Sequence, residues 1–569
     1  MTSFPLLLVP LVPLLIAALA VFPGFRSSLP WAALVAPAPA LLLIILYAGP
    51  ISQDVPALLL GVRLELDATR LAFLAFTAFL WTLAAWSAVA YLKNDTRRTR
   101  FCVFFLLAMA GNFGLILAGD VASFYTFFSM MSLASWGLVV HERSRFALFA
   151  GRSYIVFAIA GELALFSGLT IAAYTAESLF LADIRQTELG GLGTLLLLLG
   201  FGIKLGVVPL HLWLPLAHAA APAPASAVLS GAMIKAGLFG ALTILPFGLV
   251  QHEQAGLVII ALGGTSIVLA ALIGASQRNP KAVLAYSSVA QMGLVAMALG
   301  TGLAVPVAWG AILPALVLFA AHHAFAKAAL FLGVPAYWSM QRPLTRTLLL
   351  LLLILPAAVL SAAPWTSGAL AKSSLKDALG TAPGFWGQAL DPVLLFSSLG
   401  TALLMLRFLA LMGRQEPKAN LSAWITGPWM VMTVLALGGV WLAPFAAPEL
   451  EDEQLANAVP IALAIGGTIC LWLLMRGTGL RVREVPPGEI LALFQFSRRP
   501  TRSAGTFSIG VPAVWWLSAS ALFQRHATVQ RANGGIALLI ILVAIIVAGL
   551  AAHPDLRALA HQPLSYPSL

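Results

Sequence analysis

Six titratable side chains lie deep within apolar stretches of this chain, where water does not normally reach a side chain. They are Glu162, Lys204, Lys235, His323, Lys327 and Lys372. Charged groups inside a membrane are costly and usually face a polar path rather than lipid. Amines, imidazoles and carboxylates in such a path can take up and release protons, because burial and neighbouring charges shift their proton affinity. The residue types therefore indicate a route for protons or other cations.

The spacing of the histidines and lysines supports this interpretation. His323 and Lys327 are four residues apart and share one helical face, whereas His322 points in another direction. An imidazole beside an ammonium is suited to proton transfer, because small shifts move histidine across neutral pH. The structural alternatives are a hydrogen-bonded histidine at either position and snorkelling of the lysines to the membrane surface. The structural alternatives for Glu162 are an ion pair with a buried lysine or a contact to another subunit.

Two of the lysines lie in apolar runs that proline interrupts. Proline removes a backbone donor and clashes with the preceding turn, so it breaks a helix. Lys204 precedes the first break and Lys372 follows the second. Candidate loop or gating residues at the two breaks are Pro209, His211, His218 and Pro364. Broken helices at membrane depth are tolerated only in protein or beside a wet cavity, and a pair of them is typical of transporters with internal repeats.

The elements that position these residues are predicted to be membrane-spanning helices. Of the 569 residues, 60% are hydrophobic and 9% charged, against roughly 25% charged in soluble domains. Apolar runs long enough to cross a bilayer recur about sixteen times along the chain. They lie near 4–23, 31–48, 68–92, 100–118, 120–140, 153–174, 191–214, 225–249, 255–275, 282–301, 306–333, 346–362, 390–412, 424–445, 457–475 and 534–552. The composition therefore predicts an all-α polytopic membrane protein.

Several classes of site are not expected. The first run lacks a basic start and an obvious cleavage site, so it is interpreted as a retained helix rather than a signal peptide. Cys102 and Cys470 form no metal or disulfide pattern, and the sequence contains no haem, zinc or nucleotide motif. We therefore expect no metal, no cofactor and no redox centre within this chain.

The distribution of charge predicts the topology. The net charge is +11, and the basic residues cluster after odd-numbered runs while acids mark the opposite loops. By the positive-inside rule, the basic loops are cytoplasmic and both termini face outward. This placement argues for a membrane surface and against nucleic acid as the partner of the basic residues.

Two segments differ from the apolar runs. Residues 61–70 alternate apolar and polar side chains briefly, which suits either a short extended piece or a loop. Residues 512–535 mix tryptophan, leucine and phenylalanine with arginine, which is typical of an amphipathic helix lying along the membrane or against a partner.

Four stretches together resemble a known family. They are KLGVVPLHLWLPLAHAAAPAPASAVLSGAMIK (204–235), LAYSSVAQMG (284–293), HAFAKAALFLG (323–333) and PWTSGALAK (364–372). The chain from about residue 60 to 410 is similar to the antiporter-like membrane subunits of respiratory complex I, membrane-bound nickel–iron hydrogenase and formate hydrogenlyase complexes, and Mrp-type Na+/H+ antiporters.

The resemblance implies a fold and a set of roles. It implies two inverted five-helix repeats, helices 4–8 and 9–13, with helices 7 and 12 broken and a C-terminal amphipathic lateral helix. The expected parts are residues 1–95 (helices 1–3), 96–250 (first repeat), 251–415 (second repeat) and 416–569 (C-terminal helices and surface segment). By position, the resemblance assigns the proton relay to Lys204 on helix 7, Lys235 on helix 8, His323 and Lys327 on helix 11, and Lys372 on helix 12.

The chain departs from the family at three positions. Ser129 stands where helix 5 usually carries a glutamate that pairs with the helix 7 lysine, and Leu216 and Asn279 replace two further acids. A neighbouring carboxylate favours the ammonium form of a lysine, so its loss alters the expected mechanism. Either Glu162 supplies the charge from the next helix, or the first half-channel is altered or does not pump.

The functional prediction is a proton-translocating subunit of a multisubunit redox-driven or cation/proton antiporter complex in the bacterial inner membrane. Its partners would be other membrane subunits and the bilayer, and the ion H+, with Na+ left open. An alternative is a subunit of an inorganic-carbon accumulation complex coupled to proton flux. A third is a scaffold with an idle polar axis, against which the cost of buried charges argues.

Overall fold

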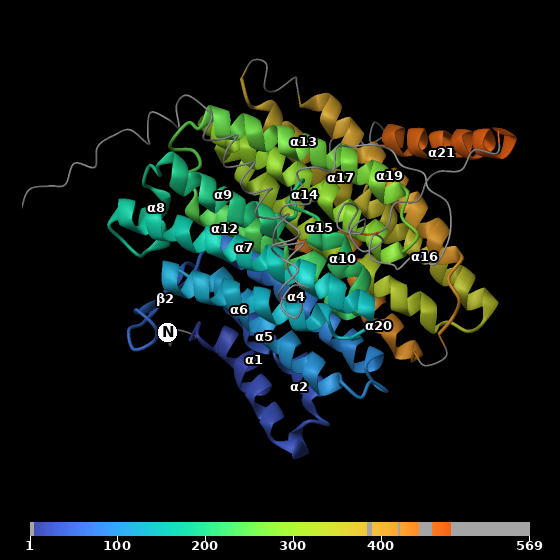
Figure 1. Cartoon of the computed structure of the whole chain (residues 1–569), viewed down its shortest axis with the longest axis horizontal. Helices are drawn as coiled ribbons and strands as arrows, with labels where there is room; N and C mark the ends of the chain where they lie inside the picture. The colour runs from blue at the N-terminus through green and yellow to red at the C-terminus, as the bar shows by residue number, and fades with distance from the viewer. Residues whose placement is uncertain (1–4, 384–389, 419–420, 443–457, 479–486, 488–569) are drawn as a thin grey trace, which may run out of the picture. The chain divides into compact units, whose positions relative to one another are not determined.

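The computed structural model describes residues 5–383, 390–418, 421–442, 458–478 and 487, and almost all of them are helical (Figure 1). The N-terminal helices are α1 (Leu8–Ala18), η1 (Leu19–Val21), η2 (Pro23–Phe25), α2 (Leu29–Val35), α3 (Ala38–Leu46), α4 (Ala68–Tyr91), α5 (Arg98–Leu117), α6 (Val121–Val139), α7 (Arg145–Ala176) and α8 (Leu181–Arg185). The middle of the chain forms α9 (Gly191–Leu205), α10 (Trp213–Ala220), α11 (Ala223–Val228), η3 (Leu229–Met233), α12 (Lys235–Ile244), α13 (Glu253–Ala275), α14 (Pro280–Ala304), η4 (Pro306–Ala308) and α15 (Trp309–Ser339). Then follow α16 (Pro343–Leu360), α17 (Ser367–Gly380), α19 (Asp391–Gly413), η5 (Ala423–Ile425), α20 (Thr426–Leu442) and α21 (Ala458–Thr478).

Helices form at the predicted apolar runs within the described residues, but fewer of them than the predicted sixteen have the length and hydropathy of a membrane span. Within the described residues, ten helices are long and apolar enough to cross a membrane, and four shorter apolar helices accompany them. An apolar run folds as a helix in lipid because every backbone polar group must find its partner within the segment. The last run, 534–552, and the amphipathic segment 512–535 lie outside the described residues.

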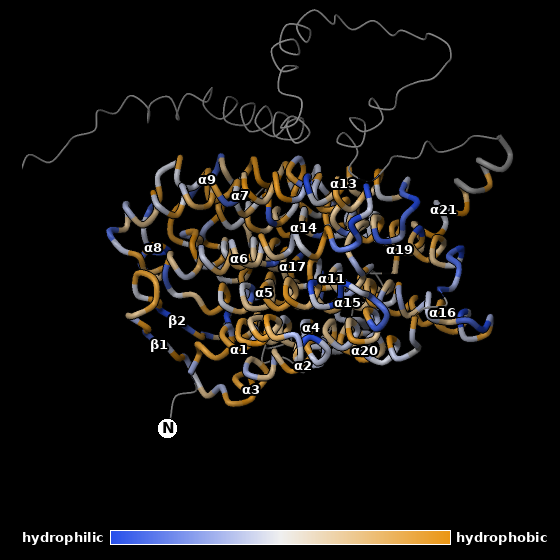
Figure 2. Tube along the Cα trace, turned by 60° about the horizontal axis from the view of Figure 1, so that its bottom comes forward, coloured by the Kyte–Doolittle hydropathy of each residue, from blue (hydrophilic) through white to orange (hydrophobic). Residues whose placement is uncertain are grey.

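Burial separates inner helices from outer ones. The apolar windows of α14, α15 and the α11–α12 segment are entirely buried, whereas only 28% of the α13 window and 33% of the α16 window are buried. Figure 1 shows α14 and α15 among the surrounding helices, and Figure 2 shows hydrophobic residues along nearly every helix. These most buried helices carry Lys235, His323 and Lys327, so the fold encloses half of the six titratable residues in protein rather than lipid.

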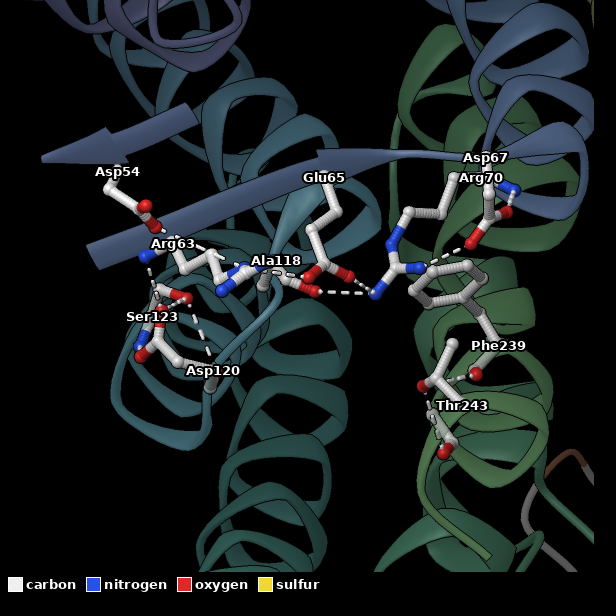
Figure 3. A network of polar contacts seen from close by, with 11 residues as sticks. Asp54, Arg63, Glu65, Asp67, Arg70, Ala118, Asp120, Ser123, Phe239 and Thr243 are labelled. Atoms are coloured by element: carbon white, nitrogen blue, oxygen red, sulfur yellow. Dashed lines mark hydrogen bonds and ion pairs between the residues drawn. The ribbon is translucent and has the colours of Figure 1, made fainter. Parts of the chain in front are cut away.

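Residues 62–66 within the segment 61–70 are extended, as one of its two interpretations predicted, and α4 begins at Ala68. Strands β1 (Ile51–Val55) and β2 (Val62–Leu66) form an antiparallel hairpin that lies against the turn between α5 and α6 (Figure 3). The Arg63 backbone N–H donates to Asp120 Oδ2 at 2.8 Å. Arg70 Nη2 pairs with Glu65 Oε2 at 3.1 Å and donates to the Ala118 carbonyl at 3.2 Å. The hairpin therefore anchors the ends of α4, α5 and α6 to one another.

A second polar cluster joins the opposite ends of these helices. His141 Nε2 donates to Asp95 Oδ2 at 2.8 Å, since a carboxylate can only accept. Burial raises the pKa of the Asp95 carboxyl, but the hydrogen bonds from His141 and from the Arg97 backbone N–H outweigh it and lower that pKa below its usual value. Asp95 is therefore ionised at neutral pH and committed to His141.

The proline-interrupted runs are broken helices, as predicted. In the first, α9 ends in Gly206, whose φ of +71° is the left-handed conformation that favours glycine, and α10 starts seven residues later. The Trp213 indole N–H donates to the Ile203 carbonyl at 2.9 Å, and the same carbonyl accepts from the Gly206 N–H. In the second, α16 ends at Leu360 and α17 starts at Ser367, with the Thr366 hydroxyl accepting from the Ala369 N–H. Both breaks thus have local partners for their released backbone groups.

The second break requires a residue without a side chain. A Cβ added to Gly368 would lie 1.8 Å from the Val359 carbonyl oxygen, a backbone atom that cannot move aside alone. Gly368→Ala should therefore destabilise the protein by about 1–3 kcal/mol or more, the usual cost of overpacking. Gly264→Ala is the matched control, since nothing lies within 4 Å of the added atom. Thermal unfolding of both variants in detergent measures the difference, and equal midpoints would contradict this packing.

Candidate functional site

Lys204 and Glu162 face one small cavity. The cavity has a volume of about 20 Å³ and is lined by both residues together with Ser132, Tyr154 and Trp213, among others. That volume holds roughly one water molecule. Glu162 lies on α7 and Lys204 in the last turn of α9, and both side chains are buried. Glu162 therefore faces Lys204, whereas the sequence left its direction open.

Lys204 gives its hydrogen bond to a serine and not to the carboxylate. Its Nζ donates to Ser132 Oγ on α6 at 2.7 Å and lies 5.2 Å from the centre of the Phe128 ring. Glu162 Oε1 is buried and has no hydrogen-bond partner, although the carboxylate interacts electrostatically with Lys204. Ser129, which stands where the family usually has glutamate, does not contact the lysine through a hydrogen bond, and its Oγ is buried without a partner. The resemblance thus identified the right helix but missed Ser132, one turn further along it.

Lys235 and His323 are in direct contact. Lys235 Nζ lies 2.6 Å from His323 Nδ1, and the same amine donates to the Ser230 carbonyl at 2.8 Å. Their exposed fractions are 1% and 0%. An N–H···N hydrogen bond needs a lone pair on one nitrogen, so the two side chains cannot both be fully protonated. At least one of the two nitrogens therefore keeps a lone pair.

A wide helical turn precedes Lys235. Leu229–Met233 is a π-helical turn between α11 and α12, in which the Ile234 N–H donates to the Leu229 carbonyl five residues back. Such turns are rare and frequently occur at functional sites. Ser230, within this turn, also shares a hydrogen bond of 2.9 Å with Ser288 on α14. The turn thereby brings the lysine beside both α14 and α15.

Lys327 continues the row from α15 to α14. It lies one turn beyond His323 and donates to the Leu284 carbonyl at 2.8 Å and to Ser287 Oγ in a short hydrogen bond. Its exposed fraction is 0%. The sequence prediction that His323 and Lys327 share a face is therefore confirmed, and Ser287 is a partner that the sequence did not indicate.

His322 connects the row to the second broken helix. Its Nδ1 lies 3.1 Å from Ser367 Oγ, the first residue of α17. It also interacts electrostatically with Lys372 and Lys235. Lys372 Nζ donates to Ser398 Oγ on α19 at 3.2 Å. A structural role for His322 was one alternative from the sequence, and the structure places the side chain between α15 and the break that precedes Lys372.

The two loop histidines differ in their surroundings. His218 is fully buried on α10, stacks on Phe331 with ring centres 4.7 Å apart, and has no hydrogen-bond partner on either ring nitrogen. His211 lies in the break between α9 and α10, its ring 6.4 Å from that of Tyr286. Pro209 lies in this first break and Pro364 in the second. Lys281, at the start of α14, is buried and donates to the Ala221 carbonyl at 2.6 Å.

The titratable residues form two groups. Lys204 and Glu162 make one, and Lys235, His323, Lys327, His322 and Lys372 make the other. Among the described residues, no hydrogen bond joins the first group directly to the second, and no cluster of three or more His, Cys, Asp or Glu side chains could hold a metal ion.

A buried row of amines and imidazoles beside two broken helices defines an antiporter-like, multi-pass membrane protein. Residues 118–375 match the family described as "NADH:quinone oxidoreductase/Mrp antiporter, TM". The segment contains all four stretches that carried the resemblance, which is thereby confirmed.

Relatives come from three kinds of complex. The chain is 29% identical over 392 residues to hydrogenase-4 component B of Escherichia coli (strain K12), covering 66% of this chain and 56% of that protein. It is 30% identical over 286 residues to an NADH-quinone oxidoreductase subunit of Desulforudis audaxviator, covering 48% and 55%. It is 27% identical over 278 residues to a Na(+)/H(+) antiporter subunit of Alkalihalophilus pseudofirmus, covering 47% and 54%. The chain thus spans about half the length of these curated relatives.

Solved structures share the fold. A chain of the Mrp complex from Dietzia sp. DQ12-45-1b superposes with a TM-score of 0.68 at 22% identity, covering 96% of this chain and 63% of that one. A chain of an archaeal membrane-bound sulfane sulfur reductase gives a TM-score of 0.65 at 20% identity, covering 82% and 99%. At these identities the likeness concerns the fold alone.

The hydrogen bond from Lys204 to Ser132 can be tested by a pair of serine substitutions. Ser132→Ala removes the hydrogen-bond acceptor that the structure gives the amine and should cost about 1–3 kcal/mol of stability, the penalty of an unsatisfied buried donor. Ser87→Ala, on α4, removes a buried oxygen that has no hydrogen-bond partner and should cost much less. Thermal unfolding in detergent compares them, and a larger loss for Ser87→Ala would exclude this geometry.

Proposed function

We propose that this chain is a proton-translocating subunit of a multisubunit complex in the bacterial inner membrane. The observation that carries the proposal is the contact between Lys235 and His323 at 2.6 Å, fully buried and one turn from Lys327. Two cationic groups at this distance would repel each other unless one of them gives up its proton. A site that must hold a proton between two bases is suited to passing it on.

The proposed route runs through the row of lysines and histidines. Protons enter from the cytoplasm, load Lys204, pass to Lys235 and His323, and reach Lys327. They leave by Lys372, and the contact of His322 with the first residue of α17 supports this last transfer. Water molecules bridge the gaps between side chains, because no hydrogen bond among the described residues connects Lys204 directly to Lys235.

Glu162 takes the place of the absent helix 5 carboxylate in this proposal. When Lys204 turns from Ser132 to the carboxylate, the opposite charge favours the ammonium form, and when it turns back the amine more readily loses its proton. The support is their shared cavity of about 20 Å³ and the unpartnered Glu162 Oε1. One water molecule can connect the two side chains across that space.

The finer architecture is also part of the proposal. Residues 96–250 and 251–415 would be two inverted five-helix repeats, the first containing the α9–α10 break and the second the α16–α17 break. Lys204 lies before its break and Lys372 after the other, which suits elements related by an inverted axis. Redox subunits or a cation gradient would drive transport, with H+ as the ion, alone or with Na+. The printed names of the relatives, which include a hydrogenase component, a quinone oxidoreductase subunit and an antiporter subunit, support such partners.

Replacement of the two lysines beside the breaks tests the route. Lys204→Ala or Lys372→Ala should lower proton flux by at least about tenfold, equivalent to about 1.4 kcal/mol on the limiting barrier. The measurement is the uptake of protons by proteoliposomes of the purified complex under an imposed potassium diffusion potential, reported by a pH-sensitive dye. Lys376→Ala is the matched control, since Lys376 lies one turn beyond Lys372 and is exposed. Wild-type flux in both test variants, with subunits assembled, would refute the route.

The role of Glu162 has its own test. Glu162→Gln keeps the shape of the side chain but removes the charge that Lys204 meets, so proton flux should fall by about tenfold or more. Glu177→Gln alters an exposed acid at the end of the same helix and should leave flux unchanged. Full activity of Glu162→Gln would take the carboxylate out of the mechanism and leave the lysine route standing.

A further inference from the structure

An open groove lies between the C-terminal end of α1 and the start of α5. Its volume is about 590 Å³, and its apolar wall includes Ala17, Val21 and Val103. Val21 is 73% exposed and its neighbour Phe22 62% exposed. Large apolar side chains exposed at the end of a membrane helix are suited to contact with lipid acyl chains.

The polar rim of the groove is made of arginines from two separate elements. Arg26 follows η2, and Arg97 and Arg100 lie at the start of α5. Their guanidinium groups donate mainly to backbone carbonyls. Arg26 Nε donates to Ala20 at 2.9 Å, Arg97 Nη1 to His141 and Glu142 at 3.2 and 3.1 Å, and Arg100 Nη2 to His141 at 2.7 Å.

Those neutral acceptors position the arginines without neutralising their charge. The ion pairs found among the described residues include none of the three, and the nearby Asp95 is committed to His141. In addition, Arg100 Nε is buried and has no hydrogen-bond partner. The groove therefore presents three positive charges, which Asp95 offsets only in part through its electrostatic interaction with Arg97 and Arg100.

The groove also lies where anionic headgroups are expected. Arg26 follows the first apolar run and the α5 arginines follow the third, so the positive-inside rule assigns both to the cytoplasmic face. The cytoplasmic leaflet carries anionic lipids, and basic pockets between helices on that side suit their headgroups. The planar guanidinium fork matches phosphate oxygens two at a time, and the N-terminus of α5 adds partial positive charge.

We propose that this groove is a binding site for one anionic phospholipid. The phosphate lies against Arg26, Arg97 and Arg100, and an acyl chain follows the apolar wall of α1 and α5. A lipid is favoured over a protein partner because one continuous surface offers both a phosphate-sized charged rim and an apolar wall that starts at the membrane interface. The site is independent of the proton route, since none of its residues belongs to the lysine row.

Native mass spectrometry of the purified complex tests the site. Complex exchanged into neutral detergent is titrated with phosphatidylglycerol, phosphatidylcholine or inorganic phosphate. The double variant Arg26→Gln/Arg100→Gln should bind phosphatidylglycerol at least about tenfold more weakly than wild type. Arg98→Gln, in the same cluster but outside the groove, is the matched control and should bind as wild type does.

Each other outcome overturns the proposal. Equal affinity in wild type and double variant, equal binding of phosphatidylcholine, or saturation by inorganic phosphate alone would each exclude a site for an anionic phospholipid. A photoreactive phosphatidylglycerol added to wild-type complex gives a second readout that does not depend on the folding of a variant. It should label peptides of α1 and α5, and labelling of a neighbouring subunit across this groove, with none on α1 or α5, would show that a protein covers it.

Discussion

The structure depends on how neutral oxygen atoms solvate buried lysine amines. Lys235, Lys281 and Lys327 donate to backbone carbonyls, and Lys204, Lys327 and Lys372 to serine hydroxyls. Taking an ammonium out of water costs several kcal/mol unless such partners replace its hydration. A neutral oxygen stabilises the cation less than a carboxylate does, and it leaves no orphan charge when the proton departs. The amines are therefore held at fixed positions without being fixed in one protonation state.

This constraint explains which helices occupy the interior. A backbone carbonyl can accept from a side chain near a helix end or where the regular hydrogen bonds of a helix are interrupted. The described helices are interrupted beside several of the buried lysines. The π turn before Lys235, the break after Lys204 and the break before Lys372 each release backbone groups in protein rather than in lipid. By contrast, the outer helix α13 is continuous over Glu253–Ala275, and only 28% of its apolar window is buried.

The sequence predicted the helices and the burial of the six titratable residues, because hydrocarbon allows few alternatives to a continuous apolar helix. It also predicted both helix breaks, since proline acts locally on the backbone. It could not predict partners such as Ser132 for Lys204 or Ser367 for His322. Those depend on the rotation of one helix against another, which packing across the bundle decides. Lys281 shows the same limit. It lies near a helix end in the sequence, but packing against the end of α10 buries its side chain.

The turn at Leu229–Met233 sets the angular position of everything that follows it on its helix. It accommodates one residue more than a regular turn, and one residue corresponds to about 100° around a helix axis. Removing a single residue there would restore an ordinary helix and point the amine at position 235 away from His323, although no atom of either side chain would have been altered. The number of residues in the preceding turn, as much as the identity of residue 235, thus determines whether the lysine amine reaches His323.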